Sequence, residues 1–137
     1  MYQGCLPHYE EGCGRIINIG SISAQRVRIF NAPYSTTKFG LVGLTHTTAL
    51  EGRQYGINCG ILHPGNTQRD SIPTGMPPPT GPGSPGGAGG PAGPMREPSM
   101  TPDEIAAAAV YMACQPPHVN VLELIQLPRE QLYLGRG

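Results

Sequence analysis

The sequence predicts an α/β fold in which a small parallel sheet carries helices on its faces, a doubly wound arrangement. Three short segments rich in β-branched residues alternate with two segments of helical character, as is typical of parallel strands joined by helical crossovers. With 137 residues, the chain is long enough for one domain with a modest core. About three strands and two to three helices are expected. Such a small sheet leaves an edge bare, a liability in a soluble protein, which hints that part of the fold is missing.

The first half of the chain predicts two strands and the helix between them. Residues 15–20 form a β-branched run after a turn signal and predict a strand buried on both faces. Residues 34–55 predict a long helix, which Gly56 ends as its C-terminal cap. Residues 57–63 predict the next strand, which a Pro-Gly pair stops.

The second half predicts one more helix and a last strand. Thr101 suits the N-cap of this helix, a proline fills the first helical position, and Glu104 stands at the reciprocal position of a capping box. The helix is expected to extend to Cys114. Residues 119–127 predict the last strand, which another proline ends.

Residues 66–100 are expected to be a disordered or mobile loop inserted into a single domain that spans residues 1–137. Within this loop, residues 73–94 hold eight of the sixteen prolines and eight of the twenty glycines. The segment lacks the apolar side chains that offset the entropy of ordering a chain. A linker between two domains is disfavoured, because the flanking segments are too short to be domains.

Composition and charge argue against several classes of protein. Nine basic and nine acidic residues leave no net charge and no basic stripe, so we expect no nucleic-acid partner. The longest purely apolar stretch, residues 105–113, is far shorter than the ~20 residues that span a bilayer, and the N-terminus lacks a signal-peptide pattern. The four cysteines show no CxxC pair and no zinc-type spacing with histidine, so we expect no metal site. The cysteines are interpreted as buried or idle thiols in a reducing compartment. A cytoplasmic protein that does not bind membranes is the resulting prediction.

Three side chains carry the candidate chemistry. Tyr34 and Lys38 lie four residues apart at the start of the long helix, so they share one of its faces. A neighbouring ammonium favours the phenolate, and a tyrosine so placed can exchange a proton near neutral pH. Ser21 follows the first strand at its carboxyl end, where parallel α/β sheets bind ligands, and its hydroxyl can stabilise charge on a carbonyl oxygen. Taken alone, YxxxK is a weak signal, because a tyrosine and a lysine on a solvated helix face are the common alternative.

In combination these residues resemble the short-chain dehydrogenases/reductases. The YxxxK pair, the serine thirteen residues before the tyrosine and the Pro-Gly strand exit agree with that family. The last helix and strand resemble those of the family too, and the matching text elsewhere is residues 6–8, 14–24, 32–40, 56–58 and 63–65. The resemblance implies a partial Rossmann-like domain and an oxidoreductase that interconverts an alcohol and a carbonyl by hydride transfer.

The resemblance also implies catalytic roles for the three side chains. Tyr34 would be the general acid/base that protonates the carbonyl oxygen during reduction. Lys38 would tune Tyr34, and Ser21 would orient and polarise the substrate carbonyl. The spacing to Tyr34 favours Ser21 over the neighbouring Ser23. A small-molecule alcohol or carbonyl compound, held by Ser21 and Tyr34, is the expected substrate.

The cofactor that the resemblance implies is NAD or NADP. Tyr34 and Lys38 are expected cofactor contacts, and Lys38 would hold the ribose hydroxyls. Pro64 and Gly65 would line the nicotinamide side, with Thr67 near the carboxamide.

Two departures from the family pattern limit what the resemblance carries over. No glycine-rich turn follows a first strand, so we expect a truncated catalytic half whose phosphate-binding partner half lies before Met1. Arg69 stands where the family pattern has a threonine, and Pro/Gly repeats replace the loop beyond it, so substrate specificity is not carried over. His63, beside the Pro-Gly exit, is interpreted as a packed or surface histidine rather than a cofactor contact.

An inactive truncated homologue that acts at most through self-association is the alternative function. In the family, the long helix bearing YxxxK packs against its copy in another subunit, and Gly40 and Gly43 suit such a close approach. A homo-oligomer is therefore expected for the full-length parent. A proline-rich adaptor built on residues 77–82 is a third interpretation with little support.

Overall fold

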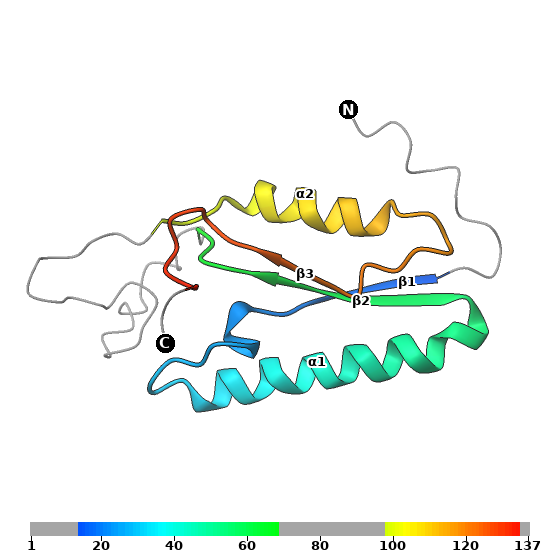
Figure 1. Cartoon of the computed structure of the whole chain (residues 1–137), viewed down its shortest axis with the longest axis horizontal. Helices are drawn as coiled ribbons and strands as arrows, with labels where there is room; N and C mark the ends of the chain where they lie inside the picture. Colours follow the sequence, from blue (N-terminus) through cyan, green and yellow to red (C-terminus); the bar gives the residue numbers. More distant parts are fainter. Residues whose placement is uncertain (1–13, 69–97, 135–137) are drawn as a thin grey trace, which may run out of the picture.

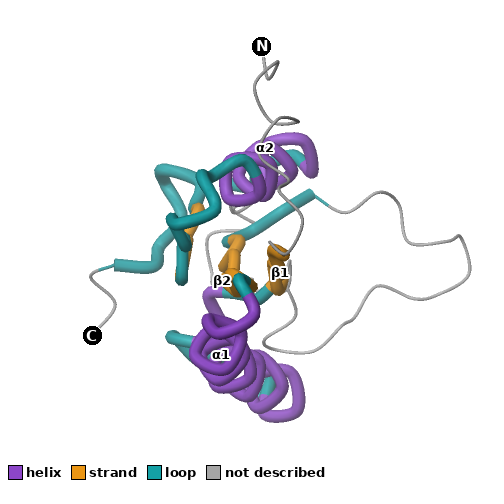
Figure 2. Tube along the Cα trace, turned by 90° about the vertical axis from the view of Figure 1, so that its right-hand side faces the viewer, coloured by secondary structure: helices purple, strands orange, loops and turns teal. Residues whose placement is uncertain are grey.

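The computed structural model describes residues 14–68 and 98–134, which form a three-layer α/β unit (Figure 1). Its sheet has the order β1-β2-β3, with β1 (Gly14–Ile19), β2 (Ile57–Pro64) and β3 (Glu123–Gln126) all parallel. Helix α1 (Ala32–Gly52) covers one face and α2 (Pro102–Ala113) the other, as Figure 2 shows. The predicted α/β class with a parallel, doubly wound sheet is confirmed.

The central strand β2 forms the core of the unit. Its residues Cys59 to His63 are buried without a break. Cys59 faces α1, where Asn18 of β1 donates hydrogen bonds to both Thr45 and Cys59. Gly60 faces α2, since a Cβ built on it would lie 3.0 Å from the terminal methyl of Met112. A strand covered by a helix on each face reads as a continuous apolar run, and β2 fits that expectation.

The expectation that the first strand is buried on both faces is wrong for β1. Ile16 is 41% exposed and Ile19 is 48% exposed, and these two side chains alternate between the two faces of the sheet. Among the described residues, β1 is the edge strand of the sheet and pairs only with β2. The side chains on both faces of β1 are therefore only partly covered. Burial of a β-branched run therefore depends on neighbours that its own sequence does not specify.

Helix α1 begins and ends as the sequence predicts, within two residues at its start. Pro33 lies in the first turn, where its missing N–H leaves no helical hydrogen bond unmade. A 3-10 turn, η2 (Arg53–Tyr55), continues α1, and Gly56 then takes the left-handed conformation with a φ of 67°. Gly40 and Gly43 have nothing within 4 Å of a built Cβ, so no described part of the chain packs against them.

Helix α2 has the predicted capping box. The hydroxyl of Thr101 accepts from the backbone N–H of Glu104, and the Glu104 carboxylate accepts from the N–H of Thr101 at 2.7 Å. This reciprocal pair satisfies two of the donors that a helix start leaves free. The helix ends at Ala113, with Cys114 as its C-cap.

The last strand is shorter than the predicted residues 119–127, because β3 comprises only Glu123–Gln126. The residues just before β3 are held to β1 and β2 by side-chain hydrogen bonds. Asn120 donates to the carbonyl of Cys59 at 2.8 Å, and Arg15 donates to the carbonyl of Val119 at 3.0 Å. These side-chain donors satisfy backbone carbonyl groups in place of a regular ladder, so the strand begins only at Glu123, after the start of the predicted segment.

The ends of the predicted long loop lie side by side. Thr67 and Met100 form an isolated parallel bridge, and Met100 is buried. The predicted disordered or mobile insertion spans residues 66–100, and its two ends, residues 66–68 and 98–100, are ordered by this pairing, so the prediction is wrong for them. Its residues 69–97 lie outside the described residues.

The described cysteines differ in state. Cys59 is a free thiol, and burial raises its pKa. Cys114 is disulfide-bonded, so the expectation of idle thiols is wrong for this residue.

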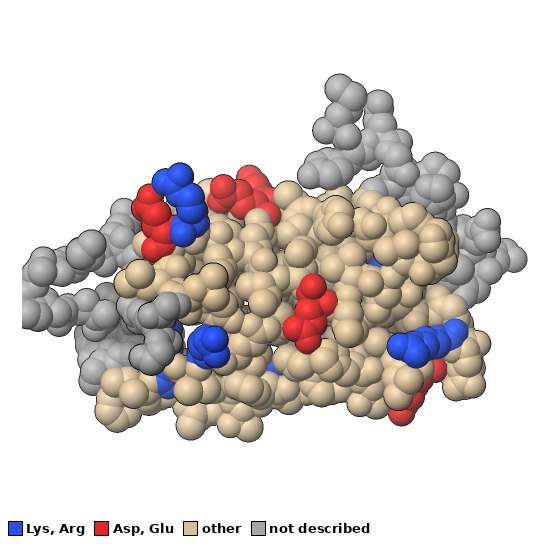
Figure 3. Space-filling model, in the orientation of Figure 1, with Lys and Arg blue, Asp and Glu red and all other residues tan. Residues whose placement is uncertain are grey.

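In residues 14–68 and 98–134, no helix has the length and apolar character needed to cross a membrane. Charged side chains of both signs are few and scattered over the face drawn in Figure 3.

Gly60 provides a stability test of the contact between β2 and the chain that precedes β3. A Cβ at this position would lie 2.1 Å from the carbonyl oxygen of Val121, which is backbone and cannot swing aside. We expect Gly60→Ala to lower the free energy of unfolding by about 1 to 3 kcal/mol, the range for overpacking a tight site. Urea denaturation of the 137-residue chain measures this change.

Gly14→Ala is the matched control, because its Cβ would meet Ile57 at an ordinary 3.4 Å. Its free energy of unfolding should change by less than about 0.5 kcal/mol. Equal losses in the two variants would contradict the close approach at Gly60.

Candidate active site

The candidate active site lies where β1 and β2 end side by side. Their register places Ile19 opposite Leu62, and the N–H of Gly20 donates to the carbonyl of Leu62 at 2.7 Å. Because the strands are parallel, the residues that follow them emerge at one edge of the sheet. Ser21 thus leaves β1 beside the Pro64 end of β2. The carboxyl edge of a parallel sheet is the usual place for ligands in such folds.

Ser21 is held at the start of a short 3-10 helix, η1 (Ile22–Ala24). It is the N-cap, and its Oγ accepts from the backbone N–H of Ser23 at 3.1 Å. Only 8% of Ser21 is exposed. Since the contact with Ser23 uses a lone pair of the oxygen, the hydroxyl hydrogen stays available to donate to another acceptor.

Tyr34 and Lys38 lie together near the start of α1, and Lys38 ties this helix to the end of β1. The Lys38 Nζ donates to the carbonyl of Ile19 at 2.9 Å and lies 5.6 Å from the centre of the Tyr34 ring. Ile19 is two residues before Ser21, and η1 packs against α1. The described residues show no hydrogen bond between the side chains of Ser21 and Tyr34. Tyr34 itself is partly open to solvent.

The Pro-Gly exit of β2 leads into a turn that the last strand holds. The N–H of Gly65 donates to the carbonyl of Gln126 at 2.8 Å. The Thr67 hydroxyl donates to the carbonyl of Gly65 at 3.1 Å. Pro64, Gly65 and Thr67 therefore lie on one turn at the same edge of the sheet as Ser21.

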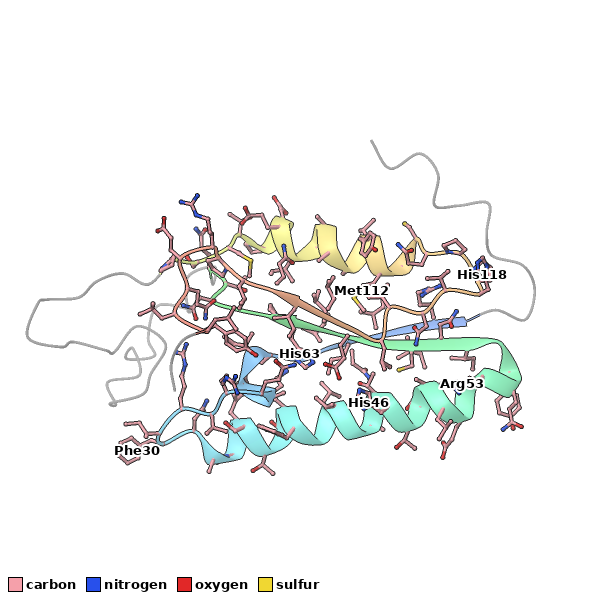
Figure 4. All side chains as sticks on the ribbon, in the orientation of Figure 1. Phe30, His46, Arg53, His63, Met112 and His118 are labelled. Carbon is pink, nitrogen blue, oxygen red and sulfur yellow. The ribbon has the colours of Figure 1, made fainter. Side chains whose placement is uncertain are left out.

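His63 is packed, and it contacts Ser21 directly. It is 0% exposed, and its Nδ1 lies 2.9 Å from the Ser21 carbonyl oxygen. Figure 4 shows His63 on the α1 side of the sheet, beside η1. The sequence predicted that His63 is either packed or on the surface, and the structure shows that it is packed. Sequence reasoning missed the contact, although a parallel register of the two strands would have placed these residues side by side.

A C-terminal segment, which no sequence motif predicts, also holds the edge of the sheet. Gln131 is buried, and its Oε1 accepts from the N–H of Asn66 at 2.9 Å. The Tyr133 hydroxyl donates to Gln25 just after η1, and the Arg26 guanidinium lies 5.8 Å from the centre of the Tyr133 ring. This segment follows the last predicted strand and carries no motif, so tertiary contacts alone reveal its role.

Comparison with known proteins gives consistent results. The family model described as short chain dehydrogenase matches residues 1–73. The L-fucose dehydrogenase of Bos taurus is 31% identical over 134 residues, covering 96% of this chain and 48% of the relative. The acetoacetyl-CoA reductase of Allochromatium vinosum is 34% identical over 115 residues, covering 76% of this chain and 39% of the relative.

The solved structures agree with these matches in fold. The crystal structure of BdcA in complex with NADPH superposes with a TM-score of 0.62 at 21% identity, covering 86% of this chain and 46% of that one. The present chain spans less than half the length of each of these three relatives. A family model that matches more than half of the chain, and a relative aligned along nearly all of it, establish membership. The chain belongs to the short-chain dehydrogenase/reductase family.

Proposed function

We propose that this chain carries the catalytic residues of an NAD(P)-dependent oxidoreductase that interconverts an alcohol and a carbonyl. Family membership supports an oxidoreductase, and the bond from Lys38 to the end of β1 is the observation that carries the residue assignment. This bond holds the helix with Tyr34 against the strand end that leads into Ser21. A phenol, an ammonium and a serine hydroxyl at one edge of a parallel sheet suit proton transfer to and from an oxygen atom.

Tyr34 is the proposed general acid/base. In the direction of reduction, its phenol donates a proton to the carbonyl oxygen while hydride adds to the carbonyl carbon, and Tyr34 is left as phenolate. The Lys38 ammonium, 5.6 Å from the ring centre, stabilises that negative charge through space. In the direction of oxidation, the same phenolate takes the proton from the alcohol.

Ser21 is the proposed donor to the substrate oxygen. Its own oxygen already accepts from Ser23, so its remaining hydrogen can point to the substrate. A fixed donor that meets charge as it develops contributes more than a mobile one, because little reorganisation is needed during the reaction. The substrate class is a small-molecule alcohol or carbonyl compound, and neither a nucleic acid nor a membrane is a proposed partner.

The donor set at the sheet edge fits the ribose end of a nicotinamide cofactor. An ammonium has three N–H donors, and the bond to Ile19 uses one of those of Lys38, so two can meet ribose hydroxyls. Thr67 and the Pro64–Gly65 turn supply a hydroxyl and backbone groups on the neighbouring strand exit. When bound, the cofactor supplies or accepts the hydride. The proposed cofactor is either NAD or NADP. The NADPH in the BdcA complex is bound by BdcA and does not decide between the two for this chain.

Self-association through α1 is a second proposal, compatible with either an active or an inactive protein. Phe39, Gly43 and Leu50 share one face of α1, and both large side chains on it are exposed. The open space at Gly43 leaves room for another backbone to approach closely. Beside this face, Val27, Phe30 and Phe39 help to line an open groove of about 530 Å³.

The cytoplasmic location expected from the sequence stays a prediction.

Tyr34→Phe tests the catalytic assignment. We expect it to lower turnover by at least about 10²-fold in an assay with NADH or NADPH and a panel of carbonyl compounds, because the proton donor is lost. Tyr55→Phe, at the opposite end of the long helix, is the control and should leave turnover unchanged. Unchanged turnover in Tyr34→Phe would refute the assignment.

Ser21 and Ser35 form a matched pair of buried serines, exposed by 8% and 7%. Ser21→Ala removes the acceptor for the Ser23 N–H, so we expect it to lower the free energy of unfolding by about 1 kcal/mol. The Ser35 Oγ is buried without a hydrogen-bond partner, so Ser35→Ala should be neutral or stabilising. Thermal unfolding measures both, and a larger loss for Ser35→Ala would contradict the capping role of Ser21.

Phe39→Lys tests the proposed interface on α1. A charge on this face should prevent burial against a second copy, so sedimentation equilibrium should show wild type as a dimer or larger and the variant as a monomer. Tyr111→Lys, which changes an exposed aromatic residue on α2, is the control and should keep the wild-type mass. A monomeric wild type would exclude this interface.

A further inference from the structure

We propose that His63 is a positioning residue for Ser21, holding the backbone from which the serine hydroxyl projects. The inference rests on the proposed function, in which Ser21 donates to the substrate oxygen. His63 is on β2, and Ser21 follows β1, so the contact bridges the ends of the two strands that form the site.

The hydrogen bond places the imidazole on the backbone of Ser21. His63 Nδ1 lies 2.9 Å from the Ser21 carbonyl oxygen and 3.3 Å from the Ser21 backbone nitrogen. One nitrogen cannot both donate its proton to the carbonyl and accept from the N–H. The shorter contact favours the tautomer in which Nδ1–H donates to the Ser21 carbonyl oxygen.

Gly20 makes room for this ring. A Cβ built on Gly20 would lie 2.6 Å from the His63 Nδ1, 2.9 Å from its Cε1 and 2.9 Å from the Cδ1 of Ile61, closer than a real Cβ comes to any atom. The backbone of Gly20 is itself fixed by its bond to Leu62. A side chain at position 20 would therefore have to displace the imidazole rather than move away from it.

The other ring nitrogen shows that packing alone does not account for a histidine here. His63 Nε2 is buried and has no hydrogen-bond partner among the described residues. An unpaired buried nitrogen is unfavourable, and an apolar side chain of similar size would avoid that cost. Leucine can fill such a space but cannot donate to the Ser21 carbonyl, so the bond through Nδ1 is what distinguishes the two side chains.

Three contacts together fix the serine. His63 and the Ala24 N–H, the latter at 3.0 Å, both meet the Ser21 carbonyl oxygen, and the Ser23 N–H holds the Ser21 Oγ. Of these three contacts only that of His63 comes from β2, so its loss allows the turn between β1 and η1 to shift together with the serine hydroxyl. Small displacements of a positioned group lower the rate of reaction strongly, because the reacting atoms no longer align.

The test compares His63→Asn with His63→Leu in the 137-residue chain. The Asn side-chain amide can donate from near the place of Nδ1, whereas Leu keeps the bulk and removes the donor. Gly20→Ala is a further variant, which displaces the ring, and the end of the Ile61 side chain beside it, without removing the imidazole. His46→Gln, on the exposed surface of α1, is the control for loss of a histidine.

Two measurements are made on each variant. Triple-resonance NMR follows the backbone amide and carbonyl shifts of Ser21, a readout that needs no turnover. Steady-state kinetics with NADH or NADPH separates kcat from KM. Thermal unfolding confirms that each variant is folded.

We expect the Ser21 shifts to move in His63→Leu and Gly20→Ala, and to stay close to wild type in His63→Asn and His46→Gln. In the same Leu and Ala variants, kcat should fall about tenfold with little change in KM, a loss of the size expected for one hydrogen bond. His63→Asn should recover most of that loss.

Unchanged Ser21 shifts in His63→Leu would overturn the proposal whatever the kinetics show. Equal losses of kcat in the Asn and Leu variants would also overturn it, because they would mean that the donor is not the relevant feature. If the shifts move as expected but the wild type shows no turnover, the link between His63 and Ser21 stands and the proposed reaction of this chain fails.

Discussion

The parallel pairing of β1 with β2 is the constraint on which the rest of the site depends. It places Ile19 opposite Leu62, so both strands end at one edge and the chain after each begins from adjacent positions. Contacts between residues far apart in sequence follow from this register, among them the one from His63 to Ser21. A shift of one residue would turn the His63 side chain to the opposite face of the sheet, away from η1 and α1.

The helices reinforce the same edge from either side of the sheet. Lys38 reaches from α1 to the carbonyl of Ile19, and Gln126 of β3 donates to the carbonyl of Glu104 in the first turn of α2. Both contacts use a side chain to engage a backbone carbonyl, which fixes an element without requiring a particular partner side chain. The sheet edge is thus held by polar contacts, while the apolar core lies along the middle of β2.

Local signals in the sequence predicted the parts of the fold whose causes are local. The capping box at Thr101 and Glu104 and the left-handed cap at Gly56 depend on a few neighbouring residues, and both are present. Burial of β1 and the extent of β3 depend on what lies beside them. Ile16 is exposed because β1 has only one neighbour among the described strands. Asn120 contacts β2 through its side chain, although the apolar run around it predicted regular strand pairing. The pattern of residues within one segment does not specify which strands lie beside it or where their pairing begins.

The candidate site divides in the same way. The YxxxK spacing places Tyr34 and Lys38 on one helix face by geometry alone, so sequence was sufficient to pair them. The position of Ser21 was predictable from its place after a strand, but the contacts that orient it were not, because they come from another strand and from the turn that follows. A motif therefore identifies which groups can react, whereas the surrounding backbone determines where their atoms lie. In this chain we assign that second role to a buried histidine and a glycine, which lie far apart in sequence and are brought together by the register of the sheet.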